Sequence, residues 1–492
     1  MVTFPTWKET FGERPSEDEI VTELSKLNRL HTVWLLARLN IHLGIDRFHA
    51  NSSETIKLQR VLITDYMDDE VLAKLKEKYG RERLDERFAF HSQQVLLVLK
   101  MAFQKADREG GVRPDDDSDA RYRLGRCLLM TNDLLLTRQS ARAIRRERES
   151  QKRRYIALQL QLGPGLDINN PPDIRNSAVR SDIMFGKLLT RIAASLDVAE
   201  IFRKYSGISL QTYLDFIFGL LAHYISRGND ELIADPGLAC VNLRSFFAEA
   251  PKEETENFWR LECKSLEEVS TEIGKSSNLM PQHDFIAFRK APFVKVSDDD
   301  AVPLHLGFIQ EKLESGLFWT VFNCLTTDQE RDRLFHTWGL LFEQYAARLL
   351  DHAFAGKEEK FVPFPKFADS GDESFDGIVI RGQYWFVMEF KGGFLKAPAK
   401  YAEDESEFLR DLELKFATGS GAGLSQLAKK IGEVFASKES QCRRIEGLDS
   451  SEVRVVVPLL IVQDSFVSSE ITAIYLIDRF RYLLRQQKLE RT

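Results

Sequence analysis

The chain has 492 residues and a formal net charge of −7, with 43% hydrophobic and 29% charged residues. This composition is that of a globular protein, and it excludes a disordered chain and a wholly basic nucleic-acid coat. The five cysteines are scattered singly, with no CxxC pair, which argues against a structural zinc site. The N-terminus has no signal-peptide pattern and no apolar run is long enough to span a bilayer. We therefore expect a cytoplasmic protein with no membrane partner.

Residues 1–160 are expected to form a helical domain. Ser16–Gly44 begins with an N-cap-like serine and an early acidic turn, and its apolar residues recur at helical spacing. Between Arg121 and Tyr155, eleven Lys or Arg residues stand against three acids. On a helix, part of this basic run can follow a phosphate backbone, or it can form a solvated helix face. The candidate nucleic-acid contacts are Arg138, Arg142, Arg145 and Arg146.

Residues 161–283 are expected to form a second helical block, which begins at a loop rich in Gly, Pro, Asn and Asp, Gln161–Asn176. In Ser195–Ile225, two helical patterns flank the tetrapeptide SGIS. This arrangement is compatible with a DNA-reading helix-turn-helix, but plain helical packing is favoured because any two short helices joined at a glycine give the same pattern. Residues 284–327 are expected to be a connector, with two short strands in FIAFRKAPFVKVSDDDAVPLHLG around the turn SDDDA, followed by a helix.

Residues 328–492 have the clearest order of elements. A long helix is followed by the strand KFVPF and by two strands, FDGIVI and YWFVMEFK, that the tight turn RGQ joins as a hairpin. The amphipathic helix GLSQLAKKIGEVFA, the apolar strand VRVVVPLLIVQ and a last helix complete the order α-β-β-β-α-β-α. We predict a multi-domain protein with a largely helical N-terminal region and a C-terminal α/β domain, whose mixed sheet is flanked by helices.

Three charged residues interrupt this apolar hairpin. Glu389 and Lys391 lie on the same face of their strand because alternate side chains share a face. Pairing through the RGQ turn places Asp376 roughly opposite residues 388–391. Two adjacent carboxylates repel unless a proton or cation lies between them, and Mg²⁺ prefers oxygen ligands of this kind. The sequence therefore predicts a divalent-cation site at one end of the sheet, and the alternative is a structural hairpin with a surface salt bridge between its strand ends.

Asp376 followed by Glu389-Phe390-Lys391 on the next strand resembles the signature of the PD-(D/E)xK nuclease superfamily. The order of elements is similar to the restriction-endonuclease-like αβββαβ core of that superfamily, although Phe375 stands where a proline is often found. The resemblance implies that Asp376, Glu389 and the main-chain carbonyl of Phe390 hold Mg²⁺ or Mn²⁺, and that Lys391 orients the attacking water. It adds two further catalytic candidates, Glu343 in the first helix and Gln426 in the helix after the hairpin. Lys396, just after the site, is a candidate phosphate contact or part of a solvated loop.

The expected function is a metal-dependent nuclease, with DNA favoured over RNA, in restriction or anti-phage defence. The helical N-terminal region would recognise substrate, form a homo-oligomer or bind a regulatory partner. One alternative is a non-catalytic regulator that keeps the nuclease fold and binds nucleic acid or protein. Another is a toxin-like nuclease that cleaves RNA, because chemistry at the phosphodiester does not distinguish the two nucleic acids.

Overall fold

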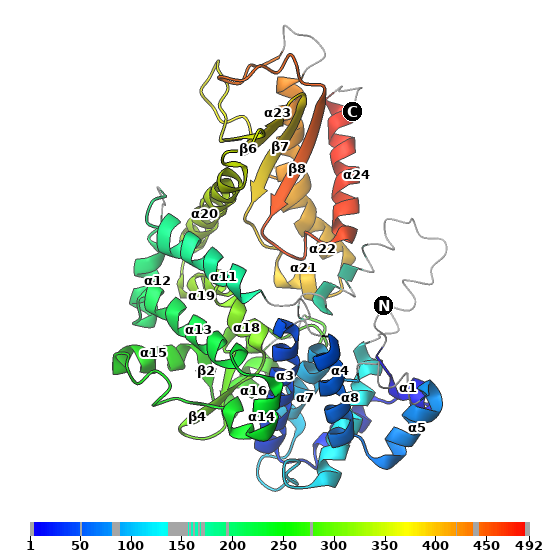
Figure 1. Cartoon of the computed structure of the whole chain (residues 1–492). Helices are drawn as coiled ribbons and strands as arrows, with labels where there is room; N and C mark the ends of the chain where they lie inside the picture. The colour runs from blue at the N-terminus through cyan, green and yellow to red at the C-terminus, as the bar shows by residue number, and fades with distance from the viewer. Residues whose placement is uncertain are drawn as a thin grey trace. The chain divides into compact units, whose positions relative to one another are not determined.

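The computed structural model describes residues 4–49, 52–80, 89–135, 156, 159–160, 163–165, 168, 173–192, 196–275, 279–419, 421–435 and 442–487. The protein is mixed α/β and divides into two compact units (Figure 1). Unit 1 takes its residues from Met1–Arg145, Ile168–Ser181 and Ala199–Cys324. Unit 2 takes its residues from Arg146–Asp167, Asp182–Val198 and Leu325–Thr492. Within the described part of the chain, no helix combines the length and apolarity needed to cross a membrane.

Unit 1 is dominated by helices. Several begin at side-chain caps, such as Ser16, whose hydroxyl accepts from the Glu19 N–H while Glu19 accepts from the Ser16 N–H. The described helices are α1 (Trp7–Phe11), α2 (Glu17–Leu24), α3 (Arg29–His49), α4 (Ser52–Tyr66), α5 (Asp69–Tyr79), α7 (Ser92–Lys105), α8 (Ser118–Leu135), α11 (Ile174–Ser181), α12 (Val198–Ser206), α13 (Leu210–Ile225), α14 (Asn229–Ala234), η2 (Pro236–Ala239), α15 (Lys252–Glu262), α16 (Leu266–Gly274), α17 (Ile286–Lys290), α18 (Leu306–Glu311) and α19 (Ser315–Cys324).

Unit 1 also contains a small sheet, and two of its strands lie within the expected second helical block. Its strand order is β1-β4-β3-β2, from β1 (Val241–Asn242), β2 (Cys263–Lys264), β3 (Phe293–Lys295) and β4 (Asp300–Pro303). The hairpin expected around SDDDA is confirmed as the antiparallel pair β3–β4. The beginning of the same stretch, FIAFRK, contains helix α17, and the Ile286 N–H at its start donates to the Asp284 carboxylate (3.2 Å).

Unit 2 contains the order of elements expected for the C-terminal region, with three short helices added between β7 and α23. Its sheet runs β5-β6-β7-β8. The described elements are η1 (Asp182–Leu188), α20 (Asp328–Phe354), β5 (Lys360–Pro363), β6 (Gly377–Arg381), β7 (Tyr384–Lys391), α21 (Ala397–Tyr401), α22 (Glu405–Leu412), η3 (Glu413–Ala417), α23 (Gly423–Val434), β8 (Val455–Val462) and α24 (Glu470–Gln486).

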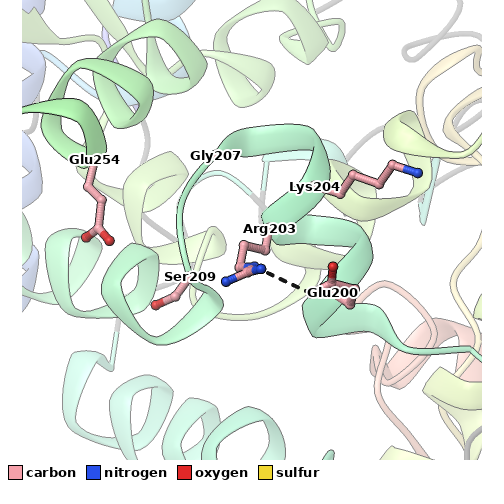
Figure 2. A pocket seen from close by; sticks show the side chains of 6 residues that line it. All are labelled: Glu200, Arg203, Lys204, Gly207, Ser209 and Glu254. Atoms are coloured by element: carbon pink, nitrogen blue, oxygen red, sulfur yellow. Dashed lines mark ion pairs between the residues drawn. The ribbon is translucent and has the colours of Figure 1, made fainter.

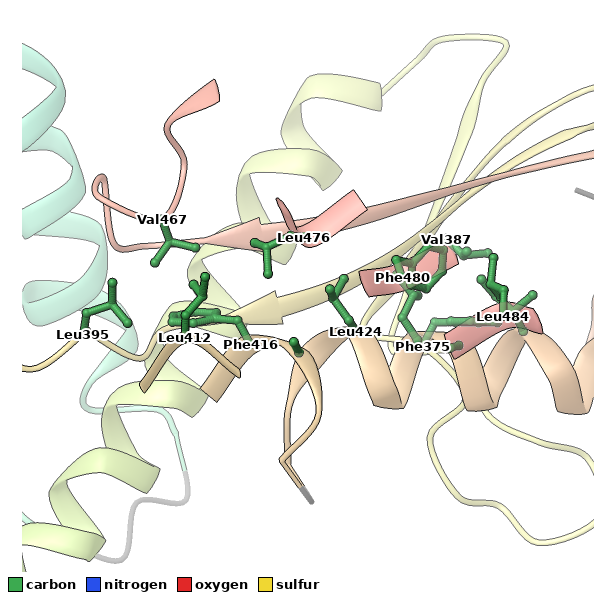
Figure 3. Close-up of a cluster of buried hydrophobic side chains, with 14 of the residues drawn as sticks. Phe375, Val387, Leu395, Leu412, Phe416, Leu424, Val467, Leu476, Phe480 and Leu484 are labelled. Atoms are coloured by element: carbon green, nitrogen blue, oxygen red, sulfur yellow. The ribbon is translucent and has the colours of Figure 1, made fainter. Parts of the chain in front are cut away.

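Helices cover both faces of the unit 2 sheet (Figure 1). On one face, α20 packs through Phe342 against Phe390 of β7. On the other face, α23 and α24 pack against Val387, and Figure 3 shows Leu424, Phe480 and Leu484 gathered there. Burial on both faces explains why β7 is apolar almost without interruption. Side chains of β7 that point toward α23 are therefore Trp385, Val387 and, further along, Glu389 and Lys391.

Candidate functional site

The two carboxylates predicted from the sequence meet at the open end of the β6–β7 hairpin. The antiparallel register pairs Gly377 with Met388, which sets Asp376 beside Glu389. The Asp376 N–H donates to the Met388 carbonyl (3.1 Å) and extends the ladder by one bond. Both acids are buried, Asp376 at 5% exposure and Glu389 at 2%. The short turn at Gly382 therefore fixes the distance along the sheet at which these side chains come together.

Asp376 is held in place by the strand that carries Glu389. The Phe390 N–H donates to Asp376 Oδ2 (2.6 Å). The N–H and carbonyl of one strand residue point to the same side, and Lys391 uses its carbonyl on the opposite side, where it accepts from the Gln463 N–H. The Phe390 carbonyl therefore lies on the side of β7 that faces β6, which is the side from which Asp376 approaches the strand.

Two lysines contact Glu389, one on each oxygen. Lys391 Nζ lies 3.0 Å from Glu389 Oε1 and donates to Gln426 Oε1 (2.6 Å). Lys430 Nζ lies 3.1 Å from Glu389 Oε2 and 3.8 Å from Asp376 Oδ1. The structure thus brings Gln426 to Lys391, as the sequence analysis expected for a site residue. It adds Lys430, which that analysis missed, although Lys430 follows Gln426 by four residues and so shares its helix face.

Burial governs the protonation of the acids. It raises the pKa of Asp376 to about 6, against the opposing effect of the Phe390 hydrogen bond and of both lysines. Burial and the charge of Asp376 also raise the pKa of Glu389. Glu343 of α20 belongs to the same group of charges, because burial and then the charge of Asp376 raise its pKa to about 8. Glu373, an exposed acid that the sequence analysis did not single out, adds to the negative potential at Asp376 and Glu343.

The arrangement can accept one hard divalent cation. Among the described residues, no group of three or more His, Cys, Asp or Glu side chains is arranged to hold a metal. Asp376 and Glu389 nevertheless supply two adjacent, buried carboxylates. Mg²⁺ typically takes one or two protein carboxylates and keeps several waters. Two buried, adjacent carboxylates therefore match the small set of protein ligands that Mg²⁺ takes.

The remaining nucleic-acid candidates are not brought to this site. Arg138, Arg142, Arg145 and Arg146 lie outside the described residues. Lys396 is exposed and precedes α21, where its backbone N–H donates to Asp411 Oδ2 (2.8 Å). This contact anchors the loop that follows β7.

The SGIS tetrapeptide of unit 1 joins α12 and α13 beside an open pocket of about 430 Å³ (Figure 2). Glu200, Arg203, Lys204, Gly207, Ser209 and Glu254 line it. Acids balance the two basic residues, and Glu200 pairs with Arg203 (3.5 Å). The exposed face of α13 carries Gln211, Asp215, Phe218 and Ala222, with no basic side chain to approach phosphates. Two helices flank the tetrapeptide, as the sequence pattern predicted, and DNA reading by α13 stays a prediction.

Comparisons with family models, with curated proteins and with solved structures return no match for this chain.

Proposed function

We propose that this protein is a metal-dependent nuclease of the PD-(D/E)xK kind that hydrolyses phosphodiester bonds, with DNA as the substrate. One observation carries the proposal: the β6–β7 hairpin sets Asp376 beside Glu389 and aligns Lys391 with Glu389 on the same strand face. The order α-β-β-β-α-β around this hairpin, which distinguishes it from an isolated Glu-x-Lys tripeptide, supports the same proposal.

In this proposal, Asp376, Glu389 and the carbonyl of Phe390 hold Mg²⁺ or Mn²⁺. A bound divalent cation supplies a Lewis acid that activates water and neutralises charge on a phosphodiester. Lys391 orients the attacking water, because its ammonium is fixed by Glu389 and Gln426 and has a third donor to spare. Glu343, partly buried next to these charges, accepts a hydrogen bond from a water at the site when it is ionised.

A second candidate function is favoured by the two lysines. Lys391 and Lys430 already neutralise the buried acids without any metal, as expected of a nuclease fold retained as a binding module for nucleic acid or protein. The restriction or anti-phage context rests on analogy with the superfamily alone. Cleavage of RNA remains an outcome of the same test, since the site acts on the phosphodiester.

The test is cleavage of supercoiled plasmid, linear duplex, single-stranded DNA and RNA, each in Mg²⁺, Mn²⁺ and EDTA. We expect metal-dependent cutting of DNA that is lost in Asp376→Asn and in Lys391→Met. Cutting of RNA alone would replace the substrate class. Absence of cutting in every condition, together with substrate binding that Asp376→Asn leaves unchanged, would favour the binding module.

A further inference from the structure

Lys430 occupies a distinctive position in the site. It lies on α23, and its side chain is 18% exposed. Within the part of the chain that the structure describes, it is the cation that forms ion pairs with both Asp376 and Glu389. Lys391, in contrast, pairs with Glu389 and donates a hydrogen bond to Gln426. These two contacts fix its ammonium group, and neither of them involves Asp376.

The four carboxylate oxygens of Asp376 and Glu389 have two kinds of partner. Asp376 Oδ2 accepts from the Phe390 N–H, and Glu389 Oε1 pairs with Lys391. The other two oxygens, Asp376 Oδ1 and Glu389 Oε2, are the ones that face Lys430 Nζ, at 3.8 Å and 3.1 Å. The ammonium group thus engages the oxygens that remain for a metal.

We propose, on the basis of the proposed function, that Lys430 is the resident counter-ion of the metal-free site and that a divalent cation must displace it. An ammonium group and a divalent cation compete for the same two oxygens, so Lys430 lowers the affinity of the site for metal. The positive charge of Lys430 also offsets the repulsion between the two buried carboxylates when no metal is bound, and so stabilises the folded state. In this role Lys430 is a positioning residue that sets the metal concentration at which the site fills.

The lysine side chain suits such an exchange. Its four-carbon stem is flexible and its charge is compact, so the ammonium can withdraw toward solvent while the stem stays packed. Lys429 provides a matched control on the same helix. Its side chain is 72% exposed and pairs with Glu433 (3.7 Å). The substitution Lys429→Met therefore removes one positive charge from α23 without altering a contact to Asp376 or Glu389.

The experiment is calorimetric titration of Mn²⁺ and of Ca²⁺ into the full-length wild type, Lys430→Met and Lys429→Met, without substrate. Thermal unfolding of the same proteins in EDTA and in Mn²⁺ is measured alongside. We expect Lys430→Met to bind Mn²⁺ at least about tenfold more tightly, because a unit charge about 4 Å away is removed. We also expect it to unfold at a lower temperature in EDTA and to gain more from Mn²⁺. Lys429→Met should match the wild type in both measurements.

Equal or weaker Mn²⁺ binding by Lys430→Met than by the wild type would overturn the proposal. If Lys430→Met does not fold in EDTA, Lys430→Gln is titrated instead, and the same direction of change is required. This test is separable from the proposed nuclease activity. Tighter binding by the variant with no cleavage by the wild type would uphold the counter-ion role and reject the nuclease. Metal-dependent cleavage by the wild type with unchanged binding by the variant would do the reverse.

Discussion

The two units each bury a glutamate from a Glu-x-Lys tripeptide, and they use it differently. In unit 1, Glu262 is fully buried, pairs with the buried Lys312 (3.0 Å) and accepts from the Tyr213 hydroxyl (2.9 Å). In unit 2, Glu389 is equally buried but has a second acid, Asp376, beside it and two lysines around it. The first cluster balances one acid with one lysine, whereas the second brings carboxylates together.

Backbone geometry separates the two tripeptides. Glu262 is the last residue of α15 and Lys264 lies in the two-residue strand β2, so the two side chains share no strand face. Lys264 turns back and donates to the Arg260 carbonyl (3.2 Å). Glu389 and Lys391 lie in one strand and their side chains meet at 3.0 Å. The first cluster is a single buried ion pair that links two elements. The second cluster sets two adjacent carboxylates against two lysines, and adjacent carboxylates are the arrangement that a cation between them stabilises.

The largest effect is expected from a substitution in the Asp376–Glu389 cluster. Glu389→Gln keeps the shape of the side chain but removes its charge, so we expect metal-dependent cleavage to fall by about 10³-fold or more. Initial rates on the preferred substrate in Mg²⁺ measure this. Glu358→Gln is the matched control, because Glu358 belongs to another Glu-x-Lys tripeptide and is exposed. A residual rate within about tenfold of wild type would contradict the assignment of Glu389.

The corresponding change in the first cluster should affect stability instead. Lys312→Met leaves Glu262 buried without its cation, and breaking a buried pair in this way costs roughly 3–5 kcal/mol. Urea unfolding followed by tryptophan fluorescence measures the loss, and Mn²⁺ affinity should stay unchanged. Lys275→Met, which removes an exposed lysine of the same unit, is the control. Equal losses in the two variants would show that the Glu262 cluster contributes no special stability.

The pH dependence of stability sharpens the contrast. The pKa of Glu343 is raised to about 8 and that of Asp376 to about 6, so the folded state holds more protons than the unfolded state between pH about 4 and 8. Stability contributed by these groups is therefore lost as pH rises through that window. We expect Glu343→Gln to unfold at a higher temperature than wild type at pH 8.5 in EDTA, and to differ little near pH 4. Parallel curves for the two proteins from pH 4 to 9 would contradict the raised pKa of Glu343.

The smallest expected effect concerns the second support of Lys391. Gln426→Leu removes the oxygen that accepts a hydrogen bond from Lys391 Nζ (2.6 Å), while the ion pair between Lys391 and Glu389 remains. We expect about a tenfold fall in kcat/KM, equivalent to roughly 1.4 kcal/mol, with Mn²⁺ affinity little changed. Lys429→Met should leave kcat/KM unaltered. No change in Gln426→Leu would mean that Glu389 alone positions the lysine.

Sequence reasoning located the part of the site that depends on local structure. The hairpin turn and the alternation of strand side chains were enough to predict that Asp376, Glu389 and Lys391 lie close together. Both signals are contained in about twenty consecutive residues. The position of Lys430 beside Glu389 depends on how α23 packs against β7. The periodicity of neither segment alone predicts this contact, because the two segments are far apart in the sequence. In the unit 1 sheet, the β3–β4 hairpin was expected, but β1 and β2 were missed because they have two residues each, too few to show alternation.

The most direct test of the central claim is to locate the metal. Crystals of the full-length protein soaked in Mn²⁺ would be measured at the manganese absorption edge, with Glu389→Gln crystals treated in the same way. The account predicts an anomalous peak bounded by Asp376, Glu389 and the Phe390 carbonyl, with Lys430 moved away from both carboxylates. The peak should be lost in Glu389→Gln. Absence of a peak at these oxygens in the wild type, with Lys430 still between them, would contradict the assignment of a metal site.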